Sequence, residues 1–312
     1  MTSRPAADGP VPTPRHAAQA APLLAVRDVI LRFGGLTSLD HVDLTVDRGV
    51  IQAVIGPNGA GKTSLFNCLT GVYTPQEGTI EFTSDGHTTP LVTGSGRRRR
   101  SRKPHAVNHV GVARTFQNIR LFAALSAFDN VKIAAETRYR TGPIGAMLRL
   151  PKARANDKST DERTEELLGF VGLWDAADEQ ASSLSCGVQR RLEIARALAT
   201  DPQLLLLDEP AAGTNPTEKR ELEQLIRRIN SERGVTVLLI EHDMRLVMAV
   251  AQRITVLNFG KVIAEGRPEE VQRDPAVVEA YLGSAEEPES GSAPEGTSGG
   301  TSGGTEEVHR DE

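Results

Sequence analysis

The sequence predicts an α/β protein with a parallel sheet and a helical insertion, and three observations support this prediction. Two continuous apolar runs, Leu204–Leu207 and Val235–Ile240, are typical of parallel strands that are covered on both faces. A third short apolar run, Ile51–Ile55, ends at a glycine and is followed by a helical pattern. Residues 125–198 contain few strand signals and several helical ones, which indicates the insertion.

The remaining elements follow in chain order. Leu24–Phe33 and Val42–Val46 are expected to be strands, and apolar residues between 65 and 69 have helical spacing before a stop at Gly71. A further helix is expected between Asn215 and Asn230, because Asn215 can cap it and a proline suits its first position. The buried stripe of this helix is expected to consist of Leu222, Leu225, Ile226 and Ile229.

The two ends of the 312-residue chain differ from the rest. Residues 1–22 are rich in Ala and Pro and lack the apolar core of a signal peptide, so they are expected to be a disordered leader. Residues 284–312 repeat Gly, Ser, Thr and Glu and are expected to be a disordered acidic tail. Residues 23–283 remain as the ordered part.

Composition excludes several classes of protein. The chain is neither collagen-like, disulfide-rich nor wholly disordered. Its two cysteines, Cys68 and Cys186, argue for a reducing compartment and against a disulfide framework or a cysteine zinc site. No apolar run reaches 18 residues, so no membrane span is expected.

The net charge of the whole chain does not indicate a class of partner, but local runs of charge can. The formal net charge is −5, and residues 284–312 alone carry −7, so the overall value indicates no class of partner. The basic stretch Arg97–Lys103 is expected to be a solvated loop, and contact with anionic lipid headgroups is the alternative.

Residues 56–63 read Gly-Pro-Asn-Gly-Ala-Gly-Lys-Thr and fit the phosphate-binding loop pattern in full, between a buried strand and a helix. The glycines let backbone N–H groups turn toward one centre, and the helix start adds its positive dipole end. Lys62 is expected to reach the β- and γ-phosphates, and Thr63 to bind Mg²⁺ through its hydroxyl. The expected nucleotide-binding residues of this segment are Gly56, Pro57, Asn58, Gly59, Ala60, Gly61, Lys62, Thr63 and Ser64.

Two acidic residues follow the apolar run Leu204–Leu207. A strand there would deliver Asp208 to its C-terminal end, where ligands bind in open parallel sheets. Asp208 is expected to hold Mg²⁺, and Glu209 to polarise the attacking water as a general base.

Residues 184–191 read Leu-Ser-Cys-Gly-Val-Gln-Arg-Arg and open a helix. Here the sequence resembles the ATP-binding-cassette (ABC) family, whose signature reads Leu-Ser-Gly-Gly-Gln. Ser185 and Gly187 match the signature, Cys186 and Val188 depart from it, and Gln189 follows. The resemblance implies that the serine hydroxyl and the N–H groups of the helix start bind the γ-phosphate of a nucleotide held by a second cassette.

Other residues match family elements in the same order. Gln117 matches the loop whose glutamine senses Mg²⁺ and water and faces the transmembrane partner, and His242 matches the switch histidine at the γ-phosphate. Gly213 and Asn215 occupy the loop that crosses the dimer interface. Phe33 matches the aromatic residue that stacks on adenine, with a core phenylalanine as the alternative. The implied catalytic residues are Glu209, His242, Gln117 and Lys62, and the implied Mg²⁺ ligands are Thr63, Gln117 and Asp208.

The resemblance covers residues 23–283 and implies an ABC ATPase fold. This fold is a P-loop NTPase (RecA-like) core with an antiparallel β subdomain, about residues 23–116 and 199–283, and an inserted α-helical subdomain, about 117–198. The segments Arg114–Phe122, Arg190–Arg196 and Ala280–Gly283 together resemble the Liv-G-type ATPase of branched-chain amino-acid importers. The Liv-G-type subunit lacks the basic stretch Arg97–Lys103, so the resemblance implies no role for this stretch.

The implied function is that of the ATP-binding and hydrolysing subunit of an importer, with ATP and Mg²⁺ as cofactors. Its implied partners are a second ABC ATPase subunit, identical or different, two transmembrane permease subunits and, indirectly, an extracytoplasmic solute-binding protein. The implied location is the cytoplasmic face of the plasma membrane.

Two other functions are open. The ATPases of lipid or lipopolysaccharide exporters share Arg190-Arg191, but the segment Arg114–Phe122 fits them poorly. A soluble ABC ATPase acting on ribosomes or nucleic acid would use the basic stretch, but the sequence has one phosphate loop and one signature, and the stretch lacks interleaved aromatic residues. A nucleic-acid partner is therefore not expected.

Overall fold

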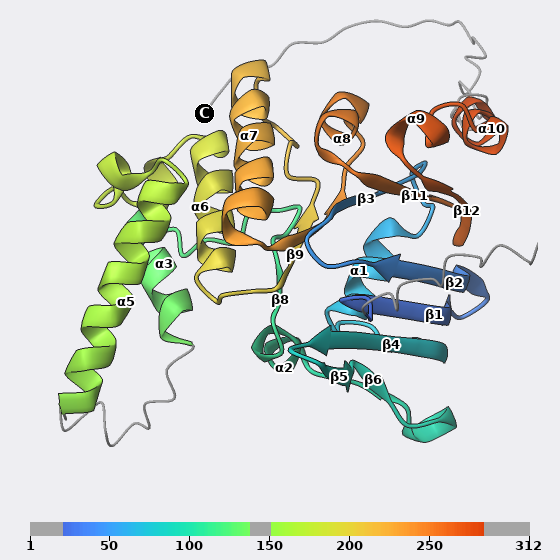
Figure 1. The fold of residues 1–312 in the computed structure, drawn as a ribbon, viewed down its shortest axis with the longest axis horizontal. Helices are drawn as coiled ribbons and strands as arrows, with labels where there is room; N and C mark the ends of the chain where they lie inside the picture. The colour runs from blue at the N-terminus through green and yellow to red at the C-terminus, as the bar shows by residue number, and fades with distance from the viewer. Residues whose placement is uncertain (1–20, 138–150, 284–312) are drawn as a thin grey trace, which may run out of the picture.

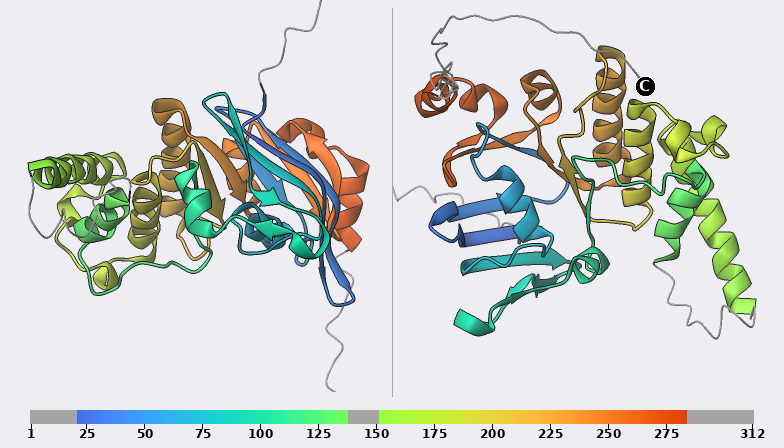
Figure 2. Two further views of the ribbon diagram at one scale, coloured as in Figure 1. Left: turned by 90° about the horizontal axis from the view of Figure 1, so that it is seen from below. Right: turned by 180° about the vertical axis from the view of Figure 1, so that it is seen from behind.

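The computed structural model describes residues 21–137 and 151–283 (Figure 1). The expected leader, residues 1–22, lies outside this part except for its last two residues, and the expected tail, residues 284–312, lies outside it entirely. The described chain contains a six-stranded sheet, a four-stranded sheet and a two-stranded hairpin. Figure 2 shows the four-stranded sheet and the helices α3, α5 and α6 toward opposite ends of the molecule.

The six-stranded sheet has the strand order β12-β11-β3-β10-β9-β8. Neighbouring strands are parallel except at one edge, where β12 pairs antiparallel with β11. Every residue of β3, β9 and β10 is buried, which explains why these strands are continuous apolar runs in the sequence. The bounds are β3 Ile51–Ile55, β8 Val112–Arg114, β9 Leu204–Asp208, β10 Thr236–Ile240, β11 Arg253–Asn258 and β12 Lys261–Gly266.

The four-stranded sheet is antiparallel and has the order β2-β1-β4-β5. Its strands are β1 Leu24–Phe33, β2 Leu36–Val46, β4 Glu77–Ser84 and β5 His87–Pro90. The prediction of β1 is confirmed. The strand predicted at Val42–Val46 begins six residues earlier, at Leu36. The prediction missed this half of β2 because it is mostly polar and has no apolar alternation.

The helices are distributed over both faces of the six-stranded sheet. Their bounds are α1 Lys62–Leu69, α2 Pro104–His109, α3 Ala127–Glu136, α5 Pro151–Phe170, α6 Cys186–Leu198, α7 Pro216–Arg233, α8 Met244–Val250, α9 Pro268–Val271 and α10 Pro275–Gly283. The 3-10 turns are η1 Gly96–Arg98, η2 Trp174–Ala176 and η3 Ala181–Ser183. No helix in the described part of the chain is long and apolar enough to cross a membrane.

Helix α7 confirms its prediction in detail. Asn215 accepts N–H groups from Thr217 and Glu218, the Glu218 carboxylate accepts from the Asn215 N–H, and the helix ends at Gly234 with φ +65°. It continues three residues beyond the predicted end. The buried residues of α7 are the four predicted ones, Leu222, Leu225, Ile226 and Ile229.

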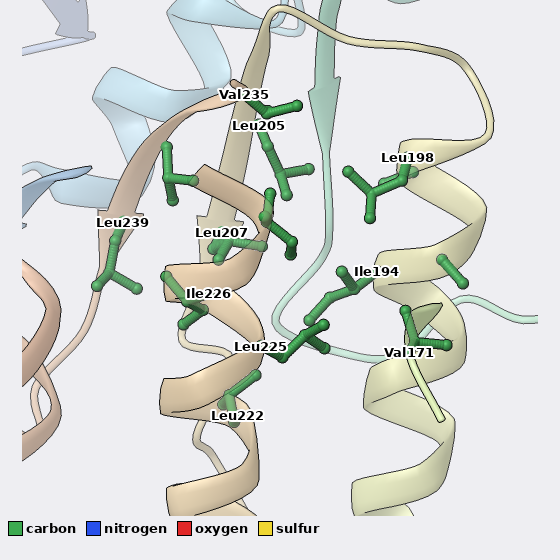
Figure 3. Close-up of a cluster of buried hydrophobic side chains, with 14 of the residues drawn as sticks. Val171, Ile194, Leu198, Leu205, Leu207, Leu222, Leu225, Ile226, Val235 and Leu239 are labelled. Atoms are coloured by element: carbon green, nitrogen blue, oxygen red, sulfur yellow. The ribbon is translucent and has the colours of Figure 1, made fainter. Parts of the chain in front are cut away.

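The core lies on both faces of the parallel sheet. Leu205 and Leu207 of β9 pack in one cluster with α6 and α7, whereas Leu204 and Leu206 pack in a second cluster with α1 and the antiparallel sheet. Figure 3 shows the first cluster, and its labelled side chains from α6, α7 and β9 are Ile194, Leu198, Leu205, Leu207, Leu222, Leu225 and Ile226. The sheet therefore separates α1 from α6.

The basic stretch forms a small hairpin and is not a fully solvated loop. Strands β6, Val92–Thr93, and β7, Arg100–Ser101, pair antiparallel, and η1 lies between them. Arg99 donates to two backbone carbonyls at the edge of the antiparallel sheet, and Arg102 donates to the carbonyl of Pro90 at 2.9 Å. Arg98, Arg100 and Lys103 are exposed, which agrees with the expected solvation, whereas the backbone contacts of Arg99 and Arg102 were not predicted because their partners are distant in sequence.

Candidate nucleotide site

The phosphate-loop pattern links β3 to α1, and glycine is required at both of its ends. A Cβ at Gly56, where φ is +150°, would lie 2.0 Å from the carbonyl oxygen of Leu257. A Cβ at Gly61, where φ is +102°, would lie 2.6 Å from the carbonyl oxygen of Ser38. Gly61 caps α1 without a side chain, so the first N–H groups of the helix face this loop and no capping side chain covers them.

The side chain of Lys62 hydrogen-bonds to the backbone of the phosphate loop. Its side chain is buried, and Nζ donates to the carbonyl oxygens of Gly56 at 2.7 Å and Pro57 at 2.9 Å. Burial lowers the pKa of Lys62, and the nearby charges of Glu209 and Asp208 act against this shift. The ammonium group thus lies among backbone dipoles with two carboxylates close by.

The C-terminal helix α10 also reaches the loop. The backbone N–H of Gly56 donates to the phenol oxygen of Tyr281, and this hydrogen bond acts against the rise in the pKa of Tyr281 that burial causes. Tyr281 is partly buried and packs against the core cluster that contains the buried Val277. Gly56 follows the last residue of β3, so Tyr281 provides an acceptor for an amide beyond the end of that strand.

Three further predicted residues are Thr63, Ser64 and Phe33. The side chain of Thr63 is exposed, whereas the Ser64 hydroxyl accepts from the Ser38 hydroxyl of β2 at 2.7 Å. Phe33 is 43% exposed and packs edge-to-face on Tyr73, with ring centroids 5.1 Å apart. The alternative reading of Phe33 as a core residue is therefore wrong.

Asp208 lies at the C-terminal end of β9 and is paired with an arginine that the sequence did not single out as a site residue. Arg114 Nη2 donates to Asp208 Oδ2 at 2.7 Å, and the two side chains are 8% and 4% exposed. The other amine of Arg114 donates to Asn67 of α1 at 2.7 Å and to Thr70, the C-cap of α1, at 3.2 Å. Arg114 thus ties the end of β8 to β9 and to the helix that follows the phosphate loop.

Glu209, Gln117 and His242 come together from three separate segments. Gln117 Nε2 donates to Glu209 Oε2 at 2.8 Å, and His242 Nδ1 lies 3.8 Å from the same oxygen. Glu209 has φ +46°, and its N–H donates to the carbonyl of Ile240 in β10 at 2.9 Å. A non-glycine residue in this region is strained, and such residues cluster at functional sites.

A second buried acid, Glu241, lies beneath this group and was missed by the sequence reasoning. Its Oε1 accepts the N–H groups of His242 at 2.9 Å and Asp243 at 3.1 Å, and its Oε2 accepts from the N–H of Ala211 at 3.1 Å. Glu241 therefore fixes the loop of His242 against the segment that follows Glu209. A charged residue directly after a buried strand was the only signal for it.

The signature segment forms the N-terminus of α6. The Ser185 hydroxyl accepts from the N–H of Val188 at 3.4 Å, and Gln189 turns back to donate to the carbonyl of Leu184 at 2.9 Å. A Cβ at Gly187 would lie 2.3 Å from the carboxyl carbon of Glu218, so glycine allows α6 to pack against the start of α7.

The loop of Gly213 and Asn215 lies beside this N-terminus. A Cβ at Gly213, where φ is +75°, would be 3.6 Å from the sulfur of Cys186. Asn215 caps α7, which gives it a structural role in the single chain. Among the residues that the structure describes, no hydrogen bond joins Ser185 to the phosphate loop of the same chain. The signature and the phosphate loop also lie on helices that the sheet separates.

The predicted metal ligands are oxygen donors of mixed type. Within residues 21–137 and 151–283, no group of three or more His, Cys, Asp or Glu side chains could hold a metal ion. The hydroxyl of Thr63, the amide of Gln117 and the carboxylate of Asp208 could supply one ligand each, which leaves room for water and for phosphate oxygens.

Comparison with known proteins shows the family of this chain. The family model described as ABC transporter matches residues 39–212, which span both the phosphate loop and Glu209. The chain belongs to the ABC transporter family. A second model, described as branched-chain amino acid ATP-binding cassette transporter, matches residues 261–287. The predictions of an ABC ATPase fold and of ATP hydrolysis are thereby confirmed.

Individual relatives agree with this family assignment. The high-affinity branched-chain amino acid transport ATP-binding protein LivG of Escherichia coli (strain K12) is 43% identical over 264 residues, which cover 85% of this chain and 99% of the relative. The corresponding protein BraF of Pseudomonas aeruginosa is 42% identical over the same shares. Among solved structures, the ADP conformation of the ATP-binding cassette MJ1267 superposes with a TM-score of 0.70 and 28% identity, covering 85% of this chain and all of that one. The family match of residues 39–212 includes the loop at residues 56–63.

Proposed function

We propose that this ABC ATPase powers the import of branched-chain amino acids. The observation that carries the proposal is the 43% identity to LivG over almost the whole length of that protein. The match of residues 261–287 to a model named for branched-chain amino acid cassettes supports it independently, because this segment lies outside the general family match.

The geometry supports the following roles for the chain's own residues in hydrolysis. Glu209 is the general base that orients and deprotonates the attacking water, with Gln117 and His242 beside it. Lys62 and the N–H groups at the start of α1 bind the phosphates.

Mg²⁺ would be held by Thr63, Gln117 and Asp208, and it would neutralise charge on the phosphates. Asp208 suits this role because Arg114 takes only one of its two carboxylate oxygens, Oδ2. The residues present therefore fit a hard cation that keeps several water ligands.

We propose further that each complete site needs two cassettes. Ser185 and Gly187 lie on α6 and Lys62 lies on α1, on opposite faces of the same sheet, so the signature of one chain is available to the nucleotide of another. Ser185 is exposed at the N-terminus of α6, and the loop of Gly213 and Asn215 lies beside it. The second cassette would be an identical or a different subunit.

The contact with the permease is proposed at a groove between the Gln117 loop, α3 and α6. This groove has a volume of about 300 Å³. Phe122 and Ile133 line it and are 49% and 39% exposed, and Arg196 lies beside them. Exposed apolar side chains with a basic rim suit a short amphipathic helix of a membrane protein. The chain would then act at the cytoplasmic face of the plasma membrane, with two permeases and, through them, a solute-binding protein.

Uptake in cells tests the solute. The chromosomal gene is changed to encode Lys62→Ala, and uptake of labelled leucine, isoleucine and valine is compared with uptake of sulfate as a control. Loss of uptake of the three amino acids with normal sulfate uptake is expected. Normal uptake of all three would refute the proposed solute, and co-purification with lipid-export permeases would point to the exporter alternative.

A further inference from the structure

The loop that carries Gln117 is held by two side chains of the signature helix α6. Arg190 Nη1 donates to the carbonyl of Phe116 at 2.7 Å, and Nη2 donates to the carbonyl of Gln117 at 3.0 Å. From the same helix, Glu193 Oε1 accepts the N–H of Phe116 at 3.2 Å and that of Arg120 at 3.4 Å. The two side chains therefore hydrogen-bond to both N–H groups and carbonyl groups of the loop backbone.

The two side chains form a buried ion pair, which we call the α6 clamp. Arg190 and Glu193 are 2% and 1% exposed, and Nη1 lies 3.0 Å from Oε2. Burial raises the pKa of Glu193, and the N–H of Phe116 and the charge of Arg190 act against this shift. Arg196, one turn further along α6, adds a hydrogen bond to the carbonyl of Arg120.

The free-energy cost of burying the Arg190–Glu193 ion pair indicates that the pair has a role other than stabilising the fold. Removing two charges from water is expensive, and well-packed apolar residues often replace such a pair without loss of stability. Nε of Arg190 is also buried without a hydrogen-bond partner among the described residues. What the pair supplies is geometry, because a planar guanidinium can bind two successive carbonyls in one fixed orientation.

We propose that Arg190 and Glu193 are positioning residues for ATP hydrolysis. They hold the backbone of Gln117 so that its amide reaches Glu209, where Nε2 and Oε2 are 2.8 Å apart. Neither residue contacts Glu209 or the phosphate loop in the structure. Since the signature residue Ser185 is the N-cap of α6, the clamp also couples the signature helix to the Gln117 loop. Displacement of α6 is thereby transmitted to the general base of the same chain.

The substitution Arg190→Lys tests this role with the charge pair retained. A lysine keeps a positive charge beside Glu193, but its point-like ammonium cannot bind both carbonyls in a fixed plane. We expect kcat for ATP hydrolysis to fall about tenfold or more, because small misplacements of catalytic groups have effects of this size. KM and the Kd for ATP are expected to stay within about twofold, because the phosphate loop is untouched.

A matched control lies next to the clamp on the same helix. Arg191 is partly buried, with its side chain 24% exposed and 3.7 Å from Glu221, and Arg191→Lys is expected to leave kcat unchanged. A second variant, Arg190→Met with Glu193→Leu, removes both charges at similar volume and is expected to fold with a near-native Tm while losing kcat. Rates are measured on the full chain with its partner subunits, and Kd is measured with a fluorescent ATP analogue.

Each outcome decides the question. A reduced kcat with unchanged Kd in both clamp variants supports the positioning role. Normal kcat in the folded double variant would overturn it, because the pair would then be dispensable for hydrolysis. A rise in Kd as large as the loss in kcat would also overturn it, because the defect would then lie in nucleotide binding.

Discussion

Replacing Arg114 with methionine should destabilise the protein through the carboxylate that remains. Methionine retains much of the apolar contact between the rings of Phe66 and Phe116, which lie 5.7 and 5.4 Å from the guanidinium carbon. It removes the 2.7 Å bond to Asp208, whose side chain is only 4% exposed and would keep its charge without its hydrogen-bonded partner. Breaking a buried pair in this way typically costs about 3–5 kcal/mol. For a chain of this size, the corresponding fall in Tm is roughly 6–20 °C.

Urea unfolding followed by circular dichroism measures this loss. The control is Arg120→Met, because the Arg120 guanidinium is exposed and lies 4.7 Å from the same Phe116 ring. The control should cost less than about 1 kcal/mol. Combining Arg114→Met with Asp208→Asn should restore part of the stability, since it removes the unpaired charge. The reasoning is refuted if Arg114→Met lowers the free energy of unfolding by no more than the control does. It is also refuted if adding Asp208→Asn only lowers stability further.

Three other perturbations test separate parts of the site. Lys62→Ala should raise the Kd for ATP more than about tenfold in a fluorescence titration, because it removes the charge that faces the phosphates, and an unchanged Kd would contradict this. Tyr281→Phe removes the acceptor of the Gly56 N–H, so nucleotide affinity should fall measurably, but by less than about tenfold, in the same titration. An unchanged affinity would show that this hydrogen bond does not contribute to nucleotide binding. Asp243→Asn keeps the cap of α8 but loses the 2.6 Å ion pair with Lys219, whose hydrogen bond lowers the pKa of Asp243 below its ordinary 3.8. Stability from this carboxylate is present above 3.8 and is lost as the pH falls through the lowered pKa, so urea unfolding should show a deficit at neutral pH that disappears in acid; an equal deficit at both pH values would refute the linkage.

Local features of the fold could be predicted from the sequence because their causes are local. The cap of α7 lies within residues 215–218, and its buried stripe repeats with the period of a helix. The phosphate loop is likewise a contiguous motif, and two of its glycines, Gly56 and Gly61, are required by contacts that a Cβ would violate. The expected subdomain boundaries stay predictions.

Features that depend on distant partners could not be predicted. Arg114 and Asp208 are 94 positions apart, and nothing in either neighbourhood indicates the other. The same holds for the hairpin of the basic stretch and for the grip of Arg190 on the Gln117 loop, 73 positions away. The prediction also missed the first half of β2, because its mostly polar residues lack the apolar alternation that marks a strand.

The general-base role of Glu209 is tested most directly by Glu209→Gln in the chain assembled with its partner subunits. Glutamine has nearly the same shape and can still accept from Gln117, but it cannot take a proton from water. Steady-state ATP hydrolysis should fall by at least about a hundredfold, with the Kd for ATP unchanged. Near-normal turnover in this variant would contradict the assignment of Glu209 as the base.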